Sequence, residues 1–190
     1  MRQEDYDKLP QDLRDSRFHK SLAELSAAKD STGNVIRYCL DPESDAGQLK
    51  AIDFDAVKGY WRKDCFVFKG KSADALFVNG DDYYLIEFKT GGINVADILR
   101  KAYDSVIALV EFGVLDWNQC KKQLSFILVG TEVKERLQHL LCISRSDYMH
   151  PSYHGLDTDP RTIEQQIVRE FVIHTPSTFK LFVSEQHWSD

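Results

Sequence analysis

Two apolar segments of the chain flank Asn79-Gly80, and charged residues stand at their far ends. Asp74 lies near the start of the first segment, and Glu87 and Lys89 lie at the end of the second. Burying a charged group is costly unless it is paired or bound to a metal. Two carboxylates and a lysine at such positions therefore predict a charged site built into a β-sheet.

The two segments, 73–78 and 83–89, are expected to form a β-hairpin. Both are apolar runs, and Asn-Gly between such runs is a strong turn signal. Side chains alternate along a strand, so Glu87 and Lys89 share one face. A four-residue turn places Asp74 opposite Glu87. A two-residue turn shifts the pairing by two positions, but the same faces of the two strands still lie side by side. Either turn brings the three charges to one end of the hairpin.

This combination of residues suits metal-assisted chemistry on phosphate esters. Two neighbouring carboxylates repel each other unless a cation lies between them. Lys89 could supply part of that charge, and a divalent cation would supply more. Oxygen ligands favour Mg²⁺ or Mn²⁺. Such an ion polarises a phosphate and lowers the pKa of a bound water, which a lysine can position or deprotonate.

The spacing of Asp74, twelve intervening residues and Glu87-Phe88-Lys89 resembles the PD-(D/E)xK nuclease superfamily. The resemblance implies that Asp74, Glu87 and the backbone carbonyl of Phe88 bind the metal. It also implies that Lys89 is the catalytic lysine. The expected activity is hydrolysis of phosphodiester bonds, in DNA more than in RNA.

Some residues follow one branch of this superfamily and others depart from it. Thr90-Gly91 after the lysine is similar to the RecB-type branch, but that branch has a glutamine four residues before a tyrosine. Leu99 stands at this place before Tyr103, and Ala73 replaces the proline of the motif. The resemblance therefore implies the superfamily and leaves the RecB-type branch open.

The superfamily often carries an acidic residue on its first helix. Glu24 is the best candidate for this role, because small residues around it would let a helix approach the sheet. Glu4, Asp15 and Asp30 are weaker alternatives. A catalytic contribution of Glu24 is expected on the resemblance alone.

The helix after the motif often provides contacts to phosphate. Arg100, Lys101 and Tyr103 are the candidates here. The Lys-x-Tyr-Asp-Ser element at 101–105 is also similar to one in small bacterial proteins of the superfamily.

Helices and strands are expected to alternate around the hairpin, according to the spacing of apolar residues. The expected strands are 35–40, 65–68, 123–130 and 178–183. The expected helices are 12–29, 53–62 (an ambiguous segment), 95–112, 131–141 and one from Pro160 through Phe171, with loops at 41–47 and 144–159.

This order predicts an α/β fold, a three-layer α/β/α sandwich with a central mixed sheet. The resemblance implies a restriction-endonuclease-like core of helix, three strands, helix and strand (αβββαβ). We expect a single domain over 1–190, with its core at about 15–130 and a C-terminal extension at 131–190.

Composition limits the setting of the protein. The chain has 190 residues, of which 43% are hydrophobic, and this predicts a globular domain. No apolar run approaches the length of a membrane span, and the polar N-terminus has no signal-peptide pattern, so a cytoplasmic protein is expected. The four cysteines are expected to be buried thiols, and His150 and His154 to lie in an exposed loop.

Charge gives mixed information about partners. The net charge of −6 argues against broad binding to nucleic acid. Residues 58–71, however, hold five basic residues against one acidic residue, and could meet phosphate. The alternative to a nuclease is a non-catalytic binding protein, such as a regulator or an immunity-type partner of another protein. A weaker alternative is a protein acting on a small phosphoester, and a homodimer or a protein partner is possible.

Overall fold

The protein is an α/β sandwich, as expected, built around a mixed six-stranded sheet. The computed structural model describes residues 1–64, 70–131 and 167–188. In spatial order the strands of the main sheet are β1 (His19–Ser21), β4 (Lys50–Asp53), β5 (Ala75–Asn79), β6 (Asp82–Lys89), β7 (Leu124–Gly130) and β8 (Glu170–His174). The pairs β1–β4, β4–β5 and β5–β6 are antiparallel, whereas β6–β7 and β7–β8 are parallel.

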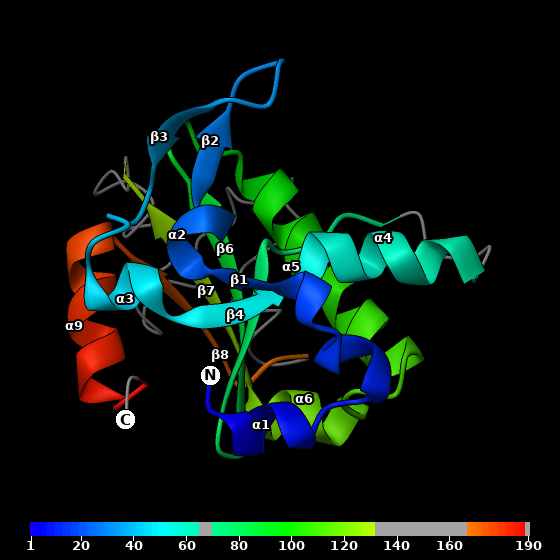
Figure 1. The fold of residues 1–190 in the computed structure, drawn as a ribbon. Coiled ribbons are helices and arrows are strands. Elements are labelled where there is room, and N and C mark those ends of the chain that lie inside the picture. The colour runs from blue at the N-terminus through cyan, green and yellow to red at the C-terminus, as the bar shows by residue number, and fades with distance from the viewer. Residues whose placement is uncertain (65–69, 132–166, 189–190) are drawn as a thin grey trace, which may run out of the picture.

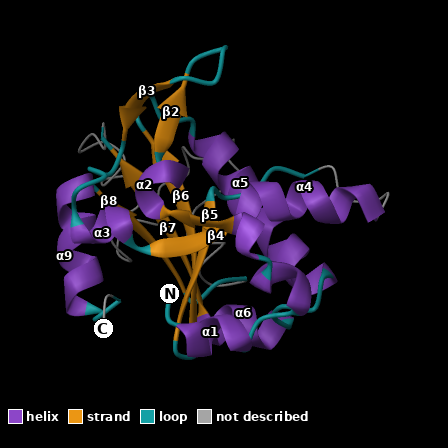
Figure 2. Cartoon of the chain, viewed as in Figure 1, coloured by secondary structure: helices purple, strands orange, loops and turns teal. Residues whose placement is uncertain are grey.

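Helices cover both faces of this sheet, and a small ribbon stands apart from it (Figure 1, Figure 2). The helices are α1 (Gln3–Asp7), the 3₁₀ turns η1 (Gln11–Arg14) and η2 (Ser16–Phe18), α2 (Leu22–Leu25), α3 (Asp45–Gln48), α4 (Phe54–Asp64), α5 (Val95–Glu111), α6 (Trp117–Gln123) and α9 (Pro176–Glu185). The ribbon consists of β2 (Ala27–Lys29) and β3 (Val35–Tyr38).

The hairpin of β5 and β6 has the register expected from the sequence. Val78 pairs with Tyr83, and one further pair, Asn79 with Asp82, closes a tight turn. Gly80 in this turn has φ of +63°, a left-handed conformation that glycine adopts without strain.

Two apolar clusters separate the three layers. On one face Leu76 and Leu85 belong to a cluster that includes Trp61 of α4 and Val106 of α5. The other face buries a cluster with α9, in which the ring of Phe77 stacks on Trp188 at 4.2 Å. The alternating side chains of β5 and β6 thus fill both cores.

Helix α5 crosses from β6 to the parallel strand β7, and its bounds confirm the expected helix at 95–112. Its N-cap is Asn94, whose side chain accepts a hydrogen bond from the backbone of Asp97. The predicted stripe of Ile98, Ala102, Val106 and Leu109 is fully buried against the sheet. The parallel strands β6 and β7 need a crossover connection, and α5 is part of it. The helix packs on the face of the sheet that carries Leu85 and Glu87 of β6.

The expected long helix at 12–29 is wrong. This segment instead forms η1, η2, β1, the single turn α2 and β2. His19–Ser21 pairs with β4, so hydrogen bonding to a distant strand overrides the helical spacing of apolar residues. A capping box between Ser21 and Glu24 then starts only one helical turn.

Strand β3 confirms the first part of the strand expected at 35–40, but it pairs with β2 and not with the main sheet. The expected loop at 41–47 ends in α3, which Ser44 caps. Helix α4 settles the ambiguous segment 53–62 as a helix, with the Asp53 side chain accepting from the backbone of Ala56 at 3.0 Å.

The expectations for the C-terminal part are also wrong where they can be examined. Phe171 lies in β8 and not in a helix, and the expected strand at 178–183 is helix α9. Phe179 and Val183 have helical i, i+4 spacing and are buried, and Thr175 caps the helix. Short apolar runs do not distinguish strand from helix by themselves.

Several expectations lie outside the described residues. These are the strand at 65–68, the helix at 131–141, the loop at 144–159 with His150 and His154, and Cys65 and Cys142. Cys39 and Cys120 are buried free thiols, as expected. Within the described ranges, no helix combines the length and apolar character needed to cross a bilayer.

Leu85 is fully buried in β6 and tests the core on the α5 face. Leu85→Ala is expected to lower the free energy of unfolding by about 2–5 kcal/mol, because it leaves a cavity. The matched control is Leu181→Ala, since Leu181 is 64% exposed and should cost less than about 0.5 kcal/mol. Urea denaturation measures both, and equal losses would contradict this assignment of the core.

Candidate metal centre

Four charged side chains meet on the α5 face of the hairpin: Asp74, Glu87, Lys89 and Lys101. The Nζ of Lys101 lies 2.7 and 2.9 Å from the two carboxylate oxygens of Glu87 and 3.4 Å from Oδ1 of Asp74. The Nζ of Lys89 lies 2.6 Å from Oε1 of Glu87. Glu87 is 0% exposed, so a fully buried carboxylate forms the centre of this network.

The hairpin register explains why the two carboxylates are neighbours. Ala75 pairs with Ile86, so Asp74 and Glu87 are the next residues along the two chains. The backbone N–H of Phe88 donates to Oδ2 of Asp74 at 2.7 Å. The juxtaposition predicted from the sequence is therefore present, and a hydrogen bond to β6 fixes the orientation of Asp74.

Helix α5 also holds the chain that leads to Asp74. The carboxylate of Asp104 accepts from the backbone N–H of Lys71 at 2.7 Å, and the Ser105 hydroxyl accepts from the N–H of Ala73 at 2.8 Å. Together with Lys101 these residues occupy positions i, i+3 and i+4 of one helix face. The Lys-x-Tyr-Asp-Ser element thus connects α5 to the strand that carries Asp74.

The environment disfavours a charge on Asp74. Burial, followed by repulsion from Glu87, raises the pKa of Asp74 to about 7, although Lys101 and the Phe88 N–H act in the opposite direction. Burial alone would lower the pKa of Lys101, but attraction to Asp74 and Glu87 outweighs it and raises that pKa. Lys101 therefore stays charged while Asp74 titrates near neutral pH.

The donor set at this position fits Mg²⁺ or Mn²⁺. Both carboxylates present oxygens to one cation, the ammonium of Lys101. The N–H and C=O of a strand residue point to the same edge, so the carbonyl of Phe88 faces the side on which Asp74 lies. Mg²⁺ usually keeps several waters and needs only one or two carboxylates. No three His, Cys, Asp or Glu side chains converge as a metal-binding group in the described residues.

Glu24 lies in α2 and its contacts are local. Its carboxylate accepts hydrogen bonds from the backbone and side chain of Ser21 at 2.7 and 2.8 Å, and Lys50 is 3.8 Å away. The hydrogen bonds from Ser21 lower the pKa of Glu24. The structure therefore gives this residue a capping role and no contact with Asp74 or Glu87.

The weaker acidic candidates are likewise engaged by their sequence neighbours. Glu4 pairs with Arg2, and Asp15 caps η2 and pairs with Arg17. Asp30 accepts hydrogen bonds from Thr32 and Asn34 in the β2–β3 turn.

The three phosphate candidates on α5 have different surroundings. Lys101 points at the carboxylates, as described above. Arg100 is exposed and forms an ion pair with Asp104 at 3.6 Å. Tyr103 is partly buried and packs against the core. Arg100 is thus the candidate whose charge is most accessible to a ligand.

Sequence reasoning missed Asp55 near this network. Asp55 lies in the first turn of α4, accepts a hydrogen bond from the hydroxyl of Ser72, and acts electrostatically on both Asp74 and Lys101. The hydrogen bonds made by Ser105 and Asp104 were also missed. Their i+3 and i+4 spacing from Lys101 was the available signal, but the partners are backbone groups that a motif does not reveal.

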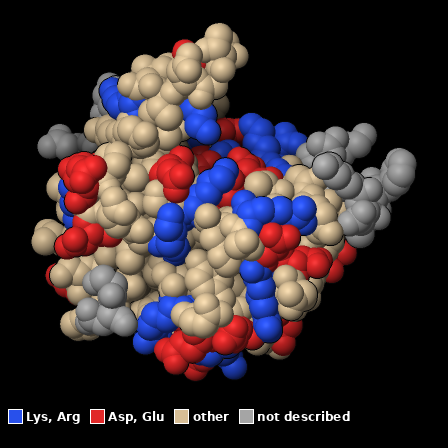
Figure 3. Space-filling model, viewed as in Figure 1, with Lys and Arg blue, Asp and Glu red and all other residues tan. Residues whose placement is uncertain are grey.

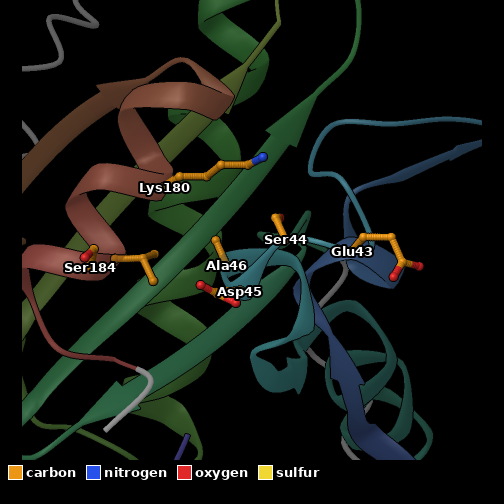
Figure 4. Close-up of a pocket in the computed structure, with 7 residues that line it drawn as sticks. Glu43, Ser44, Asp45, Ala46, Lys180 and Ser184 are labelled. Atoms are coloured by element: carbon orange, nitrogen blue, oxygen red, sulfur yellow. The ribbon is translucent and has the colours of Figure 1, made fainter.

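A pocket of about 310 Å³ lies between α3 and α9, away from this network (Figure 4). Its lining includes Glu43, Asp45 and Lys180. Helix α9 belongs to the cluster on the opposite face of the sheet from α5. This pocket therefore does not open onto Asp74 and Glu87.

Comparisons with known proteins leave the family undetermined. No protein-family model matches the chain, and neither a curated protein nor a solved structure matches it. A function for this chain is therefore to be inferred from the geometry of the site.

Asp74→Asn is expected to stabilise the protein at pH 8 and to have little effect at pH 5. The pKa of Asp74 is about 7 in the folded protein and 3.8 in a free side chain, so between these values only the folded state keeps the proton. Wild-type stability therefore falls as pH rises from about 4 through 7, whereas the variant lacks this dependence. We expect its melting temperature to exceed that of wild type by about 3 °C or more at pH 8.

Thermal unfolding across this pH range measures the difference, with Asp12→Asn as control because Asp12 is exposed. An Asp74→Asn protein that is less stable than wild type at pH 8 would contradict a raised pKa.

Proposed function

We propose that the protein is a Mg²⁺- or Mn²⁺-dependent nuclease that hydrolyses phosphodiester bonds, with DNA as the favoured substrate. The observation that carries this proposal is the meeting of Asp74 and Glu87 at the end of one hairpin, with Lys89 bonded to Glu87. The antiparallel strands β4, β5 and β6, followed across α5 by the parallel strand β7, support it, because a PD-(D/E)xK core has three strands, a helix and a further strand. In this chain α4 is inserted between β4 and β5, and α6 between α5 and β7.

In this mechanism Asp74, Glu87 and the Phe88 carbonyl would hold the divalent cation. When bound, that ion would polarise the scissile phosphate and acidify a water. Lys89 lies on the same strand face as Glu87 and is 24% exposed, so its ammonium can orient the attacking water by donating hydrogen bonds to it. The hydrogen bond from the Phe88 N–H holds the Asp74 side chain beside β6, where it would serve as a ligand together with Glu87.

A second candidate is a non-catalytic binding protein with the same fold. Two observations favour it. The net charge is −6, and basic and acidic side chains are interspersed on the face shown in Figure 3 without a continuous basic stripe. A protein partner or a homodimer would need no such stripe, whereas nucleic acid binding gains most of its affinity from phosphate contacts.

Cleavage of plasmid, single-stranded DNA and RNA in Mn²⁺ or Mg²⁺ tests the nuclease proposal. Wild type should cut DNA only with metal, and Lys89→Ala should lower the rate by roughly 10²–10⁴-fold, because it removes the group that acts on the water. Lys121→Ala is the matched control, since Lys121 is an exposed lysine of α6. A folded wild-type protein that cuts no nucleic acid in either metal would favour the binding protein.

A further inference from the structure

Lys101 lies where a cation shared by the two carboxylates would lie. Its ammonium is within hydrogen-bond distance of both oxygens of Glu87 and forms an ion pair with Asp74. Lys89, in contrast, forms an ion pair with Oε1 of Glu87, and within the described residues no ion pair joins it to Asp74. Lys101 is thus the lysine that bridges the proposed metal ligands.

Charge balance argues against the Lys101 ammonium and a divalent cation occupying the site between the two carboxylates at the same time. When both carboxylates are ionised, their charges and those of the two ammonium groups sum to zero. A divalent cation on the same oxygens would then leave two excess positive charges in a site where Glu87 is 0% exposed. Like charges this close in a partly desolvated site repel each other strongly. The oxygens of Glu87 that Lys101 engages are also those a metal would need.

We propose that Lys101 is a competitor of the divalent cation for Asp74 and Glu87, and that metal binding displaces its ammonium from the site. This inference rests on the proposed function, because it takes Asp74 and Glu87 as the metal ligands.

The surroundings of Lys101 allow such a displacement. A lysine ammonium sits on a flexible four-carbon stem, so it can move without the helix moving. Asp55 is close enough to act electrostatically on Lys101, and its side chain is 56% exposed. Asp55 is already ion-paired with Lys58 at 3.7 Å, so a displaced Lys101 ammonium would move outward toward solvent, where a substrate phosphate would also attract it.

Isothermal titration calorimetry of the protein with Mn²⁺ tests the competition between Lys101 and the metal. Lys101→Met removes the charge while keeping a long side chain, so it should bind Mn²⁺ roughly 10- to 100-fold more tightly than wild type. Lys121→Met is the control, and it should bind as wild type does. Equal or weaker binding by a folded Lys101→Met protein would overturn the proposal.

A second measurement uses wild type alone, because Lys101→Met leaves two carboxylates with one ammonium and could fold poorly. Lys101 is 15% exposed, and displacement should increase its labelling by an amine-reactive reagent at saturating Mn²⁺, as read by mass spectrometry. Labelling of the exposed Lys121 should not change.

The outcomes separate this inference from the function on which it rests. Unchanged labelling of Lys101 at saturating Mn²⁺ would overturn the displacement while leaving the metal site intact. Failure of both wild type and Lys101→Met to bind Mn²⁺ would overturn the proposed nuclease, and this inference with it.

Discussion

The fully buried carboxylate of Glu87 is the constraint on which the rest of the site depends. A charge without access to water must be paired, and removing one partner of such a pair is costly. Glu87 has two partners, Lys89 on its own strand and Lys101 on α5. Because one partner comes from the crossover helix, the ionic network links the hairpin to α5 directly. The position of that helix is thus set by apolar packing and by charge together.

The same helix controls the geometry of Asp74. Asp104 and Ser105 bind the backbone of residues 71–73, and the Phe88 N–H binds the Asp74 side chain. Asp74 is consequently held against Glu87 although their charges repel, and this repulsion contributes to its raised pKa. Repulsion between two carboxylates that the fold holds together is typical of functional sites, where stability is given up for a reactive arrangement.

The sequence was informative where local patterns and tertiary packing agree. The Asn-Gly turn fixed the hairpin register, and the register alone placed Asp74 beside Glu87. The apolar stripe of α5 likewise predicted its bounds. At 12–29 and 178–183 the local pattern was ambiguous, and pairing with β4 or packing beneath the sheet decided the outcome. Glu24 failed to join the site for the same reason, because the helix expected to carry it does not form.

Electrostatics also bears on how a nucleic acid could approach. The four central charges sum to zero when all are ionised, and the chain carries a net charge of −6. The basic segment at 58–71 offers less positive charge to a phosphate than its sequence suggests. Lys58 donates to the carbonyl of Gly70 at 2.7 Å, and Lys71 forms an ion pair with Asp97. Among the side chains that the structure describes, the site therefore has little unpaired positive charge. A bound divalent cation would supply such charge, so in this protein metal binding and phosphate binding would favour each other.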